Sequence, residues 1–318
     1  MTDNQAIRRD EMAIKPKSPT SLYHYTSGKA LVSILTHGEV WFSHPRFLND
    51  SQEWLWASKI VTQSILARAA KHRKNYLRKG CLASEFEFLL RKMLEYFNNP
   101  PFIMRNHPIV RPFIFCLSTK KDALSQWRAY GKGEYCIEFD AERLREATKA
   151  TLIPIRYRKM GFDRELSQYI DHYFDANLRN ISGQGYIDIE TKHESGAQLQ
   201  SYMPEEYFLS RKSKGFSEEQ EWRLVLGRMG GEDYRREIIM GVESRYPTPH
   251  LKIKIFEAAL PRAGLRPHEY PGLSPIIKSV MCGPGADPER SEASLQTLGE
   301  KLGFEIKVEF SSIPYRMT

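Results

Sequence analysis

The chain has 318 residues, a formal net charge of +8, and 41% hydrophobic and 27% charged residues. This is the composition of an ordinary globular protein, and the chain is long enough to bury a hydrophobic core without disulfides or structural metal ions. The four cysteines, Cys81, Cys116, Cys136 and Cys282, show no C-x-x-C spacing, which argues against a zinc cage or a disulfide framework. No apolar run has the length of a signal peptide or a membrane span. We therefore expect a cytoplasmic protein with free thiols and no membrane partner.

The positive charge favours an anionic partner, whether a nucleotide, a nucleic acid or an acidic protein. Basic residues are spread along the chain, and one local cluster stands at Arg68 to Lys79, "RAAKHRKNYLRK". A solvated helix face is the simpler interpretation of this cluster, and a nucleic-acid footprint is the alternative.

The first predicted unit is a strand, a helix and a second strand. Leu22 to Tyr25 forms the first strand, and Thr26 or Ser27 caps a helix whose apolar residues recur at helical spacing until Gly38. Val40 to Phe42 is the returning strand. Residues 1–20 form a polar leader that we expect to be flexible.

Residues 54–97 have a helical pattern that we interpret as an insertion, and the apolar run Phe113 to Thr119 predicts a buried strand. Further on, the pattern predicts a helix and two strands: Asp122 to Tyr130, Tyr135 to Phe139, and Thr151 to Arg158.

The last unit is again strand, helix, strand. The strands are Ile276 to Met281 and Phe304 to Phe310, and the helix runs from Pro288 to Leu302 with Asp287 as its cap. Strands and helices interleave irregularly along the chain. The sequence therefore predicts one α+β domain, residues 21–318, around a mixed or mainly antiparallel sheet.

The common nucleotide-binding and hydrolase signatures are missing: there is no Walker loop, no G-x-G-x-x-G between strand and helix, and no G-x-S-x-G. "YGKGEY" is interpreted as a hairpin turn. "CGPGADP" is interpreted as a plain strand-to-helix turn; a phosphate bound at the N-terminus of the following helix is the less favoured alternative. The nine histidines lack ligand spacing, so no metal is expected.

Short patterns far apart in the sequence bring together the residue types of a ligand pocket. Together they offer an imidazole, hydroxyls, aromatic faces and a carboxylate pair. They are "YHYTS" with His24, Tyr25 and Thr26; "CLST" with Ser118, followed by "SQWRAYG" with Trp127 and Tyr130; and "EEQEWR" with Glu219 and Glu221, two apart at the entry of a strand and hence on one face.

The chain resembles a bacterial family named domain of unknown function 2971 from about residue 22 to 310. The motifs that carry the resemblance are "LYHYTS", "FSHPRFLNDSQE", "FCLS", "SQWRAYG" followed by "EYCIEFD", "KGFSEEQEWRLV" and "GPGAD". The name of this family implies no activity.

A more remote resemblance is to the ADP-ribosyltransferase superfamily of the His-Tyr-Glu type. It rests on the order of three features along the chain: a strand that contains a histidine, an element that contains an aromatic residue or a serine, and a glutamate at the start of a strand. The resemblance implies a split, mainly antiparallel sheet with helical insertions and NAD as substrate, bound by His24 and stacked on by Tyr130 or Tyr25. It makes Glu221 catalytic; the missing second serine after Thr119 departs from the family pattern.

The residue types suit this chemistry. Cleavage of the nicotinamide–ribose bond passes through an oxocarbenium-like state, which a carboxylate such as Glu221 stabilises. Glu219 can orient or deprotonate the nucleophile, and its like charge is expected to raise one of the two pKa values. His24 and Thr26 can hydrogen-bond ribose hydroxyls, and Tyr130 or Trp127 can stack on the charged pyridinium ring.

The structural alternatives are an ordinary strand-edge histidine at His24, an ion pair of Glu221 with Arg223, and a core position for Trp127. The expected function is an NAD-consuming enzyme, an ADP-ribosyltransferase or NAD glycohydrolase, acting on an unknown protein or nucleic-acid acceptor. A toxin or antiphage-defence setting with an inhibitory partner is expected by analogy. The rival hypotheses are a nucleic-acid-binding or nucleic-acid-processing protein and a non-catalytic interaction module.

Overall fold

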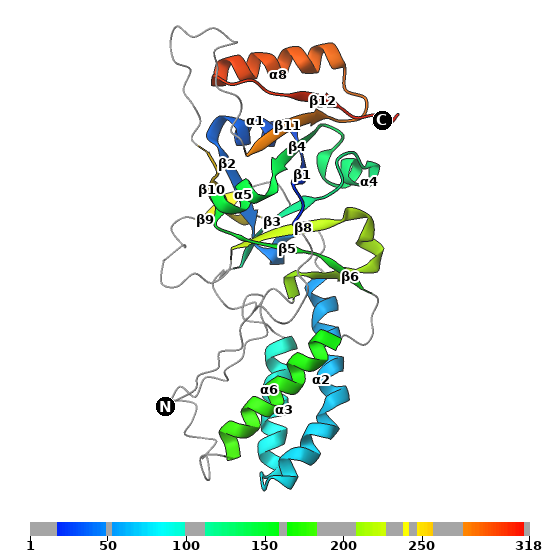
Figure 1. Ribbon diagram of the computed structural model, residues 1–318, viewed down its shortest axis with the longest axis vertical. Coiled ribbons are helices and arrows are strands. Elements are labelled where there is room, and N and C mark those ends of the chain that lie inside the picture. The colour runs from blue at the N-terminus through cyan, green and yellow to red at the C-terminus, as the bar shows by residue number, and fades with distance from the viewer. Residues whose placement is uncertain are drawn as a thin grey trace. The chain divides into compact units, whose positions relative to one another are not determined.

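The computed structural model describes residues 18–48, 53–98, 112–158, 164–182, 208–226, 238–241, 247–256 and 276–314. The chain divides into two compact units (Figure 1). The helical unit comprises residues 52–107 and 159–208 with 1–17, and the sheet unit comprises 18–51, 108–158 and 209–318. Residues 1–17 of the expected leader lie outside the described residues. The single domain over 21–318 stays a prediction.

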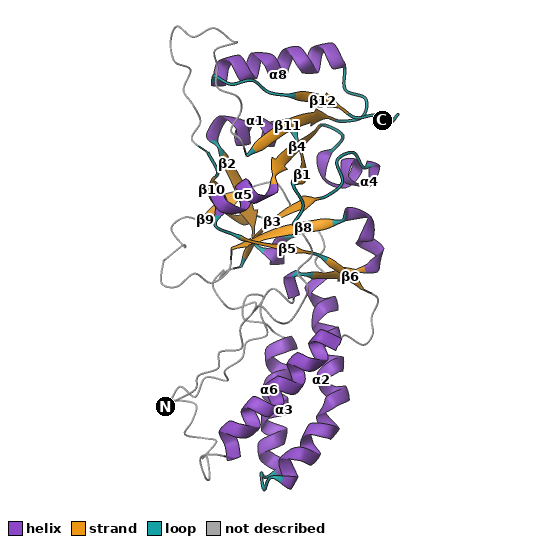
Figure 2. Ribbon diagram, in the orientation of Figure 1, coloured by secondary structure: helices purple, strands orange, loops and turns teal. Residues whose placement is uncertain are grey.

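The helical unit contains α2 (Glu53–Arg78), α3 (Ala83–Asn98) and α6 (Arg164–Ser182) (Figure 2). Helix α2 packs against both α3 and α6, and the shared core is rich in aromatic rings, including Tyr76, Phe86 and Phe174. The helical pattern predicted for residues 54–97 is confirmed as two helices rather than one. They separate at Gly80, which has a φ of 81°, a backbone conformation that suits glycine.

Within the described ranges, the sheet unit is built around one ten-stranded sheet. Its main strand order is β12-β11-β4-β1-β3-β2-β10-β9, with β8 paired to β3 and β5 paired to β8. All these pairs are antiparallel except β11 with β12. The strand bounds are β1 Ser21–Thr26, β2 Glu39–Ser43, β3 Phe113–Ser118, β4 Tyr135–Asp140, β5 Thr151–Pro154, β8 Glu221–Leu226, β9 Ile238–Gly241, β10 Thr248–Lys254, β11 Ile277–Cys282 and β12 Val308–Phe310. The predicted α+β class with a mainly antiparallel sheet is confirmed.

The opening strand-helix-strand unit is confirmed. Ser27 caps helix α1 (Gly28–His37), and Gly38 ends it in the left-handed conformation with a φ of 63°. A Cβ at Gly38 would stand 2.1 Å from the carbonyl oxygen of Phe256, so glycine is required there for space as well as for conformation. Strands β1 and β2 then both pair with β3, at its two ends.

The predicted strand Thr151 to Arg158 divides into β5 and β6 (Arg156–Arg158), which belong to different sheets. Strand β6 pairs in parallel with β7 (Arg211–Ser213). Strand β5 pairs with β8, so the short second sheet is connected covalently to the edge of the large one. This arrangement places β7 close to the start of β8.

Capping residues locate two other helices of the sheet unit. Asp140 accepts a hydrogen bond from the Arg143 amide at the start of α5 (Ala141–Thr148). Asp287 does the same for Arg290 at the start of α8 (Pro288–Leu302), and Gly303 ends α8 in the left-handed conformation. The predicted bounds of α8 are therefore confirmed, whereas the strand after it is shorter than the predicted Phe304 to Phe310.

The two faces of the large sheet carry different clusters. One face holds the main apolar core, to which Leu22, Phe115 and Phe139 belong. The other face holds a smaller cluster of Tyr25, Trp127, Cys136 and Met281. Because successive side chains of a strand point to opposite faces, the register assigns each residue of β1, β3 and β8 to one face or the other.

The "CGPGADP" turn is tested by replacing Gly283. A Cβ at this position would stand 2.1 Å from the carbonyl oxygen of Gly133 and 3.1 Å from the Trp127 ring. Gly283→Ala should therefore lower the free energy of unfolding by about 2 kcal/mol, measured by denaturant titration. Gly215→Ala is the control, since its Cβ would meet only the Ser213 hydroxyl, at 4.0 Å; equal stability losses in the two variants would contradict the packing of the turn.

Candidate functional site

The candidate site lies where β3 ends and β8 begins. The two strands are antiparallel, and Ser118 stands opposite Glu221. A 3₁₀ helix, Lys214–Glu219, leads into β8 through Gln220, which has a φ of 42°. This left-handed residue turns the chain sharply between Glu219 and Glu221.

Lys212 brings the two carboxylates together. Its Nζ lies 2.6 Å from Glu219 Oε2 and 3.1 Å from Glu221 Oε2. Their spacing of two residues predicted that the two carboxylates would lie on one face of a strand. In the structure only Glu221 belongs to β8, so they meet because the Gln220 turn and the Lys212 ammonium hold them together.

Glu221 is the more deeply buried of the two carboxylates, at 6% exposed. Arg223 Nε donates to Glu221 Oε1 at 2.6 Å, and a terminal nitrogen of the same guanidinium donates to Oε2 at 3.1 Å. Burial by itself raises the pKa of Glu221, but the charges of Arg223 and Lys212 outweigh it and lower the pKa to about 2. Glu221 is therefore ionised and held in place by its partners. The ion pair of Glu221 with Arg223, which the sequence offered as the structural alternative to a catalytic role, is present.

Glu219 lies closer to solvent and meets an aromatic side chain. The Tyr130 hydroxyl donates to Glu219 Oε1 at 2.8 Å. Tyr130 is 39% exposed and stands in the π-helical turn Trp127–Gly131. Burial of the hydroxyl raises the pKa of Tyr130, Lys212 opposes this shift and Glu219 adds to it, so the hydroxyl stays protonated as a donor.

Backbone contacts fix the Glu219–Glu221 turn from two sides. The Ser118 hydroxyl donates to the Glu219 carbonyl oxygen at 2.7 Å and accepts from the Lys120 amide at 3.0 Å. On the other side, the Glu221 amide donates to the Tyr157 hydroxyl at 2.7 Å. Ser118, expected as a ligand-binding residue, thus holds the turn that positions the carboxylates.

Tyr25 and Trp127 pack with each other in the interior. Their rings meet edge to face at 4.7 Å, and Trp127 is fully buried with its indole N–H donating to Asp122 at 2.7 Å. The Tyr25 hydroxyl donates to the Lys120 carbonyl at 2.8 Å and accepts from the Ala123 amide. Both rings therefore occupy core positions. Of the three aromatic residues predicted at the site, Tyr130 is the one whose side chain is exposed.

His24 lies on the other face of the sheet from Glu221. The register aligns Tyr23 with Ser118 and Ser118 with Glu221, so His24, the residue after Tyr23, points the opposite way. Its ring stands 4.5 Å from Phe115, and its Nδ1–H donates to the Cys116 carbonyl oxygen at 3.2 Å. Thr26 shares this face by alternation and is 6% exposed. The structure thus does not bring His24 and Thr26 to the carboxylates.

The two glycine turns singled out in the sequence line one cavity of about 650 Å³. It is bordered by Gly28, Lys132 to Tyr135, Pro284 to Ala286, and Ser291. Glu134 Oε2 accepts from the Gly28 amide at 2.5 Å, so a carboxylate of the chain already occupies the N-terminus of α1. Lys132 lines this cavity and is not part of the ion network of Lys212.

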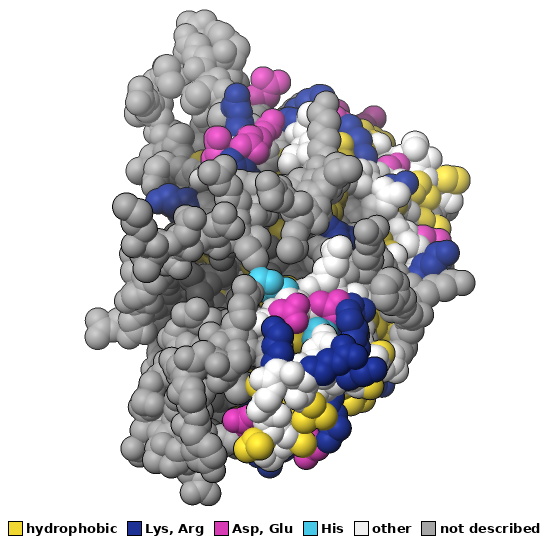
Figure 3. Space-filling view, turned by 60° about the horizontal axis from the view of Figure 1, so that its bottom comes forward, with side chains coloured by type: hydrophobic (Ala, Val, Ile, Leu, Met, Phe, Trp, Pro, Cys, Tyr) yellow, Lys and Arg dark blue, Asp and Glu magenta, His cyan; other side chains and the backbone are white. Residues whose placement is uncertain are grey.

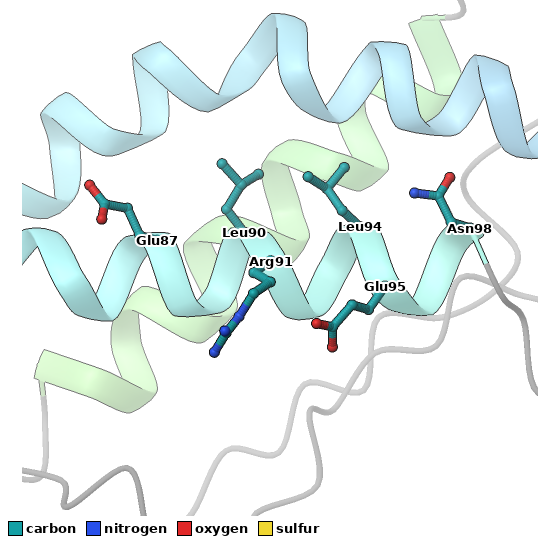
Figure 4. Close-up of a pocket in the computed structure, with 6 residues that line it drawn as sticks. All are labelled: Glu87, Leu90, Arg91, Leu94, Glu95 and Asn98. Carbon is teal, nitrogen blue, oxygen red and sulfur yellow. The ribbon is translucent and has the colours of Figure 1, made fainter.

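A second cavity, of about 360 Å³, lies on the helical unit along α3. Figure 4 shows Leu90 and Leu94 on the side of α3 that faces α2, with Arg91 and Glu95 directed away from it. The Thr62 hydroxyl donates to Asn98 Oδ1 at 2.9 Å beside this lining. The surface that these residues present to the cavity is mainly apolar.

Part of the basic cluster of α2 is paired with acidic neighbours. The Arg68 guanidinium and His72 both bind Asp171, and Arg73 lies 3.4 Å from Glu87. Figure 3, with this end of the molecule turned forward, shows acidic and basic side chains side by side on the described surface. The arrangement favours the interpretation as a solvated helix face.

Within the described ranges, no group of three or more His, Cys, Asp or Glu residues is arranged to hold a metal ion. No helix in that part of the chain combines the length and apolar character needed to cross a bilayer.

The model of a protein family of unknown function, DUF2971, matches residues 126–224. The matched stretch contains the ion network and Tyr130 but not His24, and it supports the resemblance to this family. Comparisons with curated proteins and with solved structures gave no match.

Lys212, Arg223 and Tyr157 were not predicted as site residues. Arg223 adjoins the predicted "EQE" pattern, and its spacing of two from Glu221 in a strand is a usable signal. Lys212 and Tyr157 belong to the short β6–β7 pair, whose contact with the start of β8 has no signature in the sequence.

Replacing Lys212 tests the ion network. Lys212→Met should lower the free energy of unfolding by about 3 kcal/mol, because the two carboxylates then lose the positive charge that lies between them and only Arg223 balances their negative charge. Adding Glu219→Gln to this variant should recover part of the loss, whereas Lys214→Met, at an exposed position, should change stability by less than about 0.5 kcal/mol. Denaturant titration measures all four proteins, and a Lys212→Met variant as stable as wild type would contradict the network.

His24 makes stability depend on pH. Burial lowers the pKa of His24 to about 4 from 6.5, although the Cys116 hydrogen bond opposes the shift. The unfolded chain therefore takes up this proton first, and stability should fall by about 3 kcal/mol as the pH drops from 6.5 towards 4. His24→Gln, which keeps an N–H donor, should flatten this slope between pH 6.5 and 4.5, and the exposed His37→Gln should not; identical slopes in wild type and His24→Gln would refute the assignment.

Proposed function

We propose that the protein consumes NAD by cleaving its nicotinamide–ribose bond, as an ADP-ribosyltransferase whose acceptor is a protein or a nucleic acid. The observation that carries the proposal is the carboxylate pair Glu219–Glu221, held by Lys212 next to the half-exposed ring of Tyr130. A fixed negative charge beside an aromatic face suits a substrate in which a cationic ring is attached to a sugar.

In this reaction the C1′–N bond breaks and its electron pair leaves with nicotinamide. Nicotinamide departs as a neutral molecule because the pyridinium is cationic in NAD, so the leaving group needs no proton. The acceptor then bonds to C1′ and releases its proton to water. The protein must chiefly stabilise the positive charge that develops on the ribose, which a preorganised carboxylate does.

We assign the ligand-facing role to Glu219. Each of its carboxylate oxygens has one partner, Tyr130 or Lys212, and keeps a lone pair for a ribose hydroxyl. Glu221 has both oxygens bound by Arg223 and Lys212 in the interior, so it acts as a positioning residue. This reverses the roles predicted from the sequence, in which Glu221 is the catalytic carboxylate and Glu219 the accessory one.

In this proposal Tyr130 stacks on the nicotinamide ring, while Tyr25, Trp127 and Ser118 hold the surrounding turns. His24 supports the sheet: it ties β1 to β3 through the Cys116 carbonyl. The pairing of β1 and β2 with the two ends of β3 is compatible with an ADP-ribosyltransferase-like split sheet. A toxin or antiphage-defence setting follows by analogy with costly NAD consumption.

Nucleic-acid binding remains the second candidate because of the net charge of +8. The pairing of Arg68 and Arg73 with acidic side chains weakens its main support.

The proposal is tested by incubating the protein with NAD and measuring nicotinamide release by chromatography. Glu219→Gln should reduce the release rate about a hundredfold or more, because it removes the charge that stabilises the ribosyl cation. Its melting temperature should stay near that of wild type, since Gln can still accept from Tyr130 Oη. Glu218→Gln, at an exposed neighbouring position, is the matched control and should keep full activity.

No nicotinamide release by wild type, together with no detectable NAD binding, would overturn the proposal. Release that is equal in wild type and Glu219→Gln would overturn the role of this carboxylate.

A further inference from the structure

Gln126 is a buried polar side chain with an unused donor. It is 5% exposed, and its amide nitrogen Nε2 has no hydrogen-bond partner within the part of the chain that the structure describes. A buried amide without a partner loses its hydration and gains nothing in return, so native proteins rarely keep one. Such a group is a candidate donor to a bound ligand.

The position of Gln126 connects it to the carboxylate pair. It ends helix α4 (Leu124–Gln126), which packs against the 3₁₀ helix that carries Glu219. It also precedes Tyr130 by four residues along a continuous helical stretch, so the two side chains lie on the same side of that stretch. Tyr130 donates to Glu219, so Gln126 belongs to the helical stretch that supplies one partner of this contact.

The neighbouring polar groups differ from Gln126 in this respect. Ser118, Lys212 and Tyr157 all make hydrogen bonds that hold the site together. Trp127, the next residue along the chain, uses its indole N–H on Asp122. Gln126 therefore differs from them in having a donor that no described contact of the resting protein uses.

We propose that Gln126 donates this N–H to the carbonyl oxygen of the nicotinamide carboxamide. This inference rests on the proposed NAD-cleaving function and adds the group that orients the nicotinamide ring. An amide donor needs an acceptor, and the carboxamide oxygen is the acceptor attached to the ring that stacks on Tyr130. The bond would fix the rotation of the ring and so direct the ribose towards Glu219.

The test compares two ligands and two proteins by isothermal titration calorimetry. The ligands are the carbocyclic analogue of NAD, which cannot be cleaved, and the same molecule with hydrogen in place of the carboxamide. Wild type should bind the first about tenfold more tightly than the second. Gln126→Met, of similar length and without the amide, should bind both equally, and its melting temperature should not fall because it buries no unpaired donor.

The matched control is Gln296→Met on the exposed face of α8, which should keep the wild-type preference. A Gln126→Met variant that still prefers the carboxamide ligand as wild type does would overturn this inference and leave the proposed function standing. A variant that loses stability and binds both ligands more weakly by the same factor would show a structural role and would overturn it too. Failure of wild type to bind either ligand would overturn the proposed function, and this inference with it.

Discussion

The organisation of the site depends on one buried ammonium group. Lys212 Nζ lies between Glu219 and Glu221, and without it two carboxylates would share a small volume with only Arg223 to balance them. Removing water from charges is costly, so a buried network of this kind is stable only when each charge has close partners. Here the partners come from β7, from β8 and from the turn between them, which couples the short second sheet to the large one.

This coupling also explains the strained residue at the turn. Gln220 adopts a positive φ, which costs a non-glycine residue free energy, and the conformation brings Glu219 back over the start of β8. The Ser118 hydroxyl and the Tyr157 hydroxyl then fix the backbone on either side. The result is a carboxylate, Glu219, held by several contacts and still partly open to solvent, with the exposed Tyr130 ring beside it.

The sequence predicted local elements well where a cap or a glycine determines them. Ser27 and Gly38 bound α1, and Asp287 and Gly303 bound α8, because each supplies a specific hydrogen bond or a left-handed conformation. The division between β5 and β6 was missed although the run from Thr151 to Arg158 contains a breaking residue, Pro154, which stands at the end of β5. The carboxylate pair was found by spacing. The role of Lys212 and the sheet face on which His24 lies were not predicted. Both follow from strand pairing and register between distant segments, which a single sequence does not reveal.

The most direct test of the account is the structure of the protein in complex with the carbocyclic NAD analogue. We expect the hydroxyls of the analogue's carbocyclic ring within hydrogen-bonding distance of the Glu219 carboxylate, about 2.5 to 3.0 Å, and the pyridinium ring against Tyr130. The Glu221 carboxylate should keep its contacts with Arg223 and Lys212. An analogue bound at another place on the chain, with Glu219 still facing only Tyr130 and Lys212, would contradict the account.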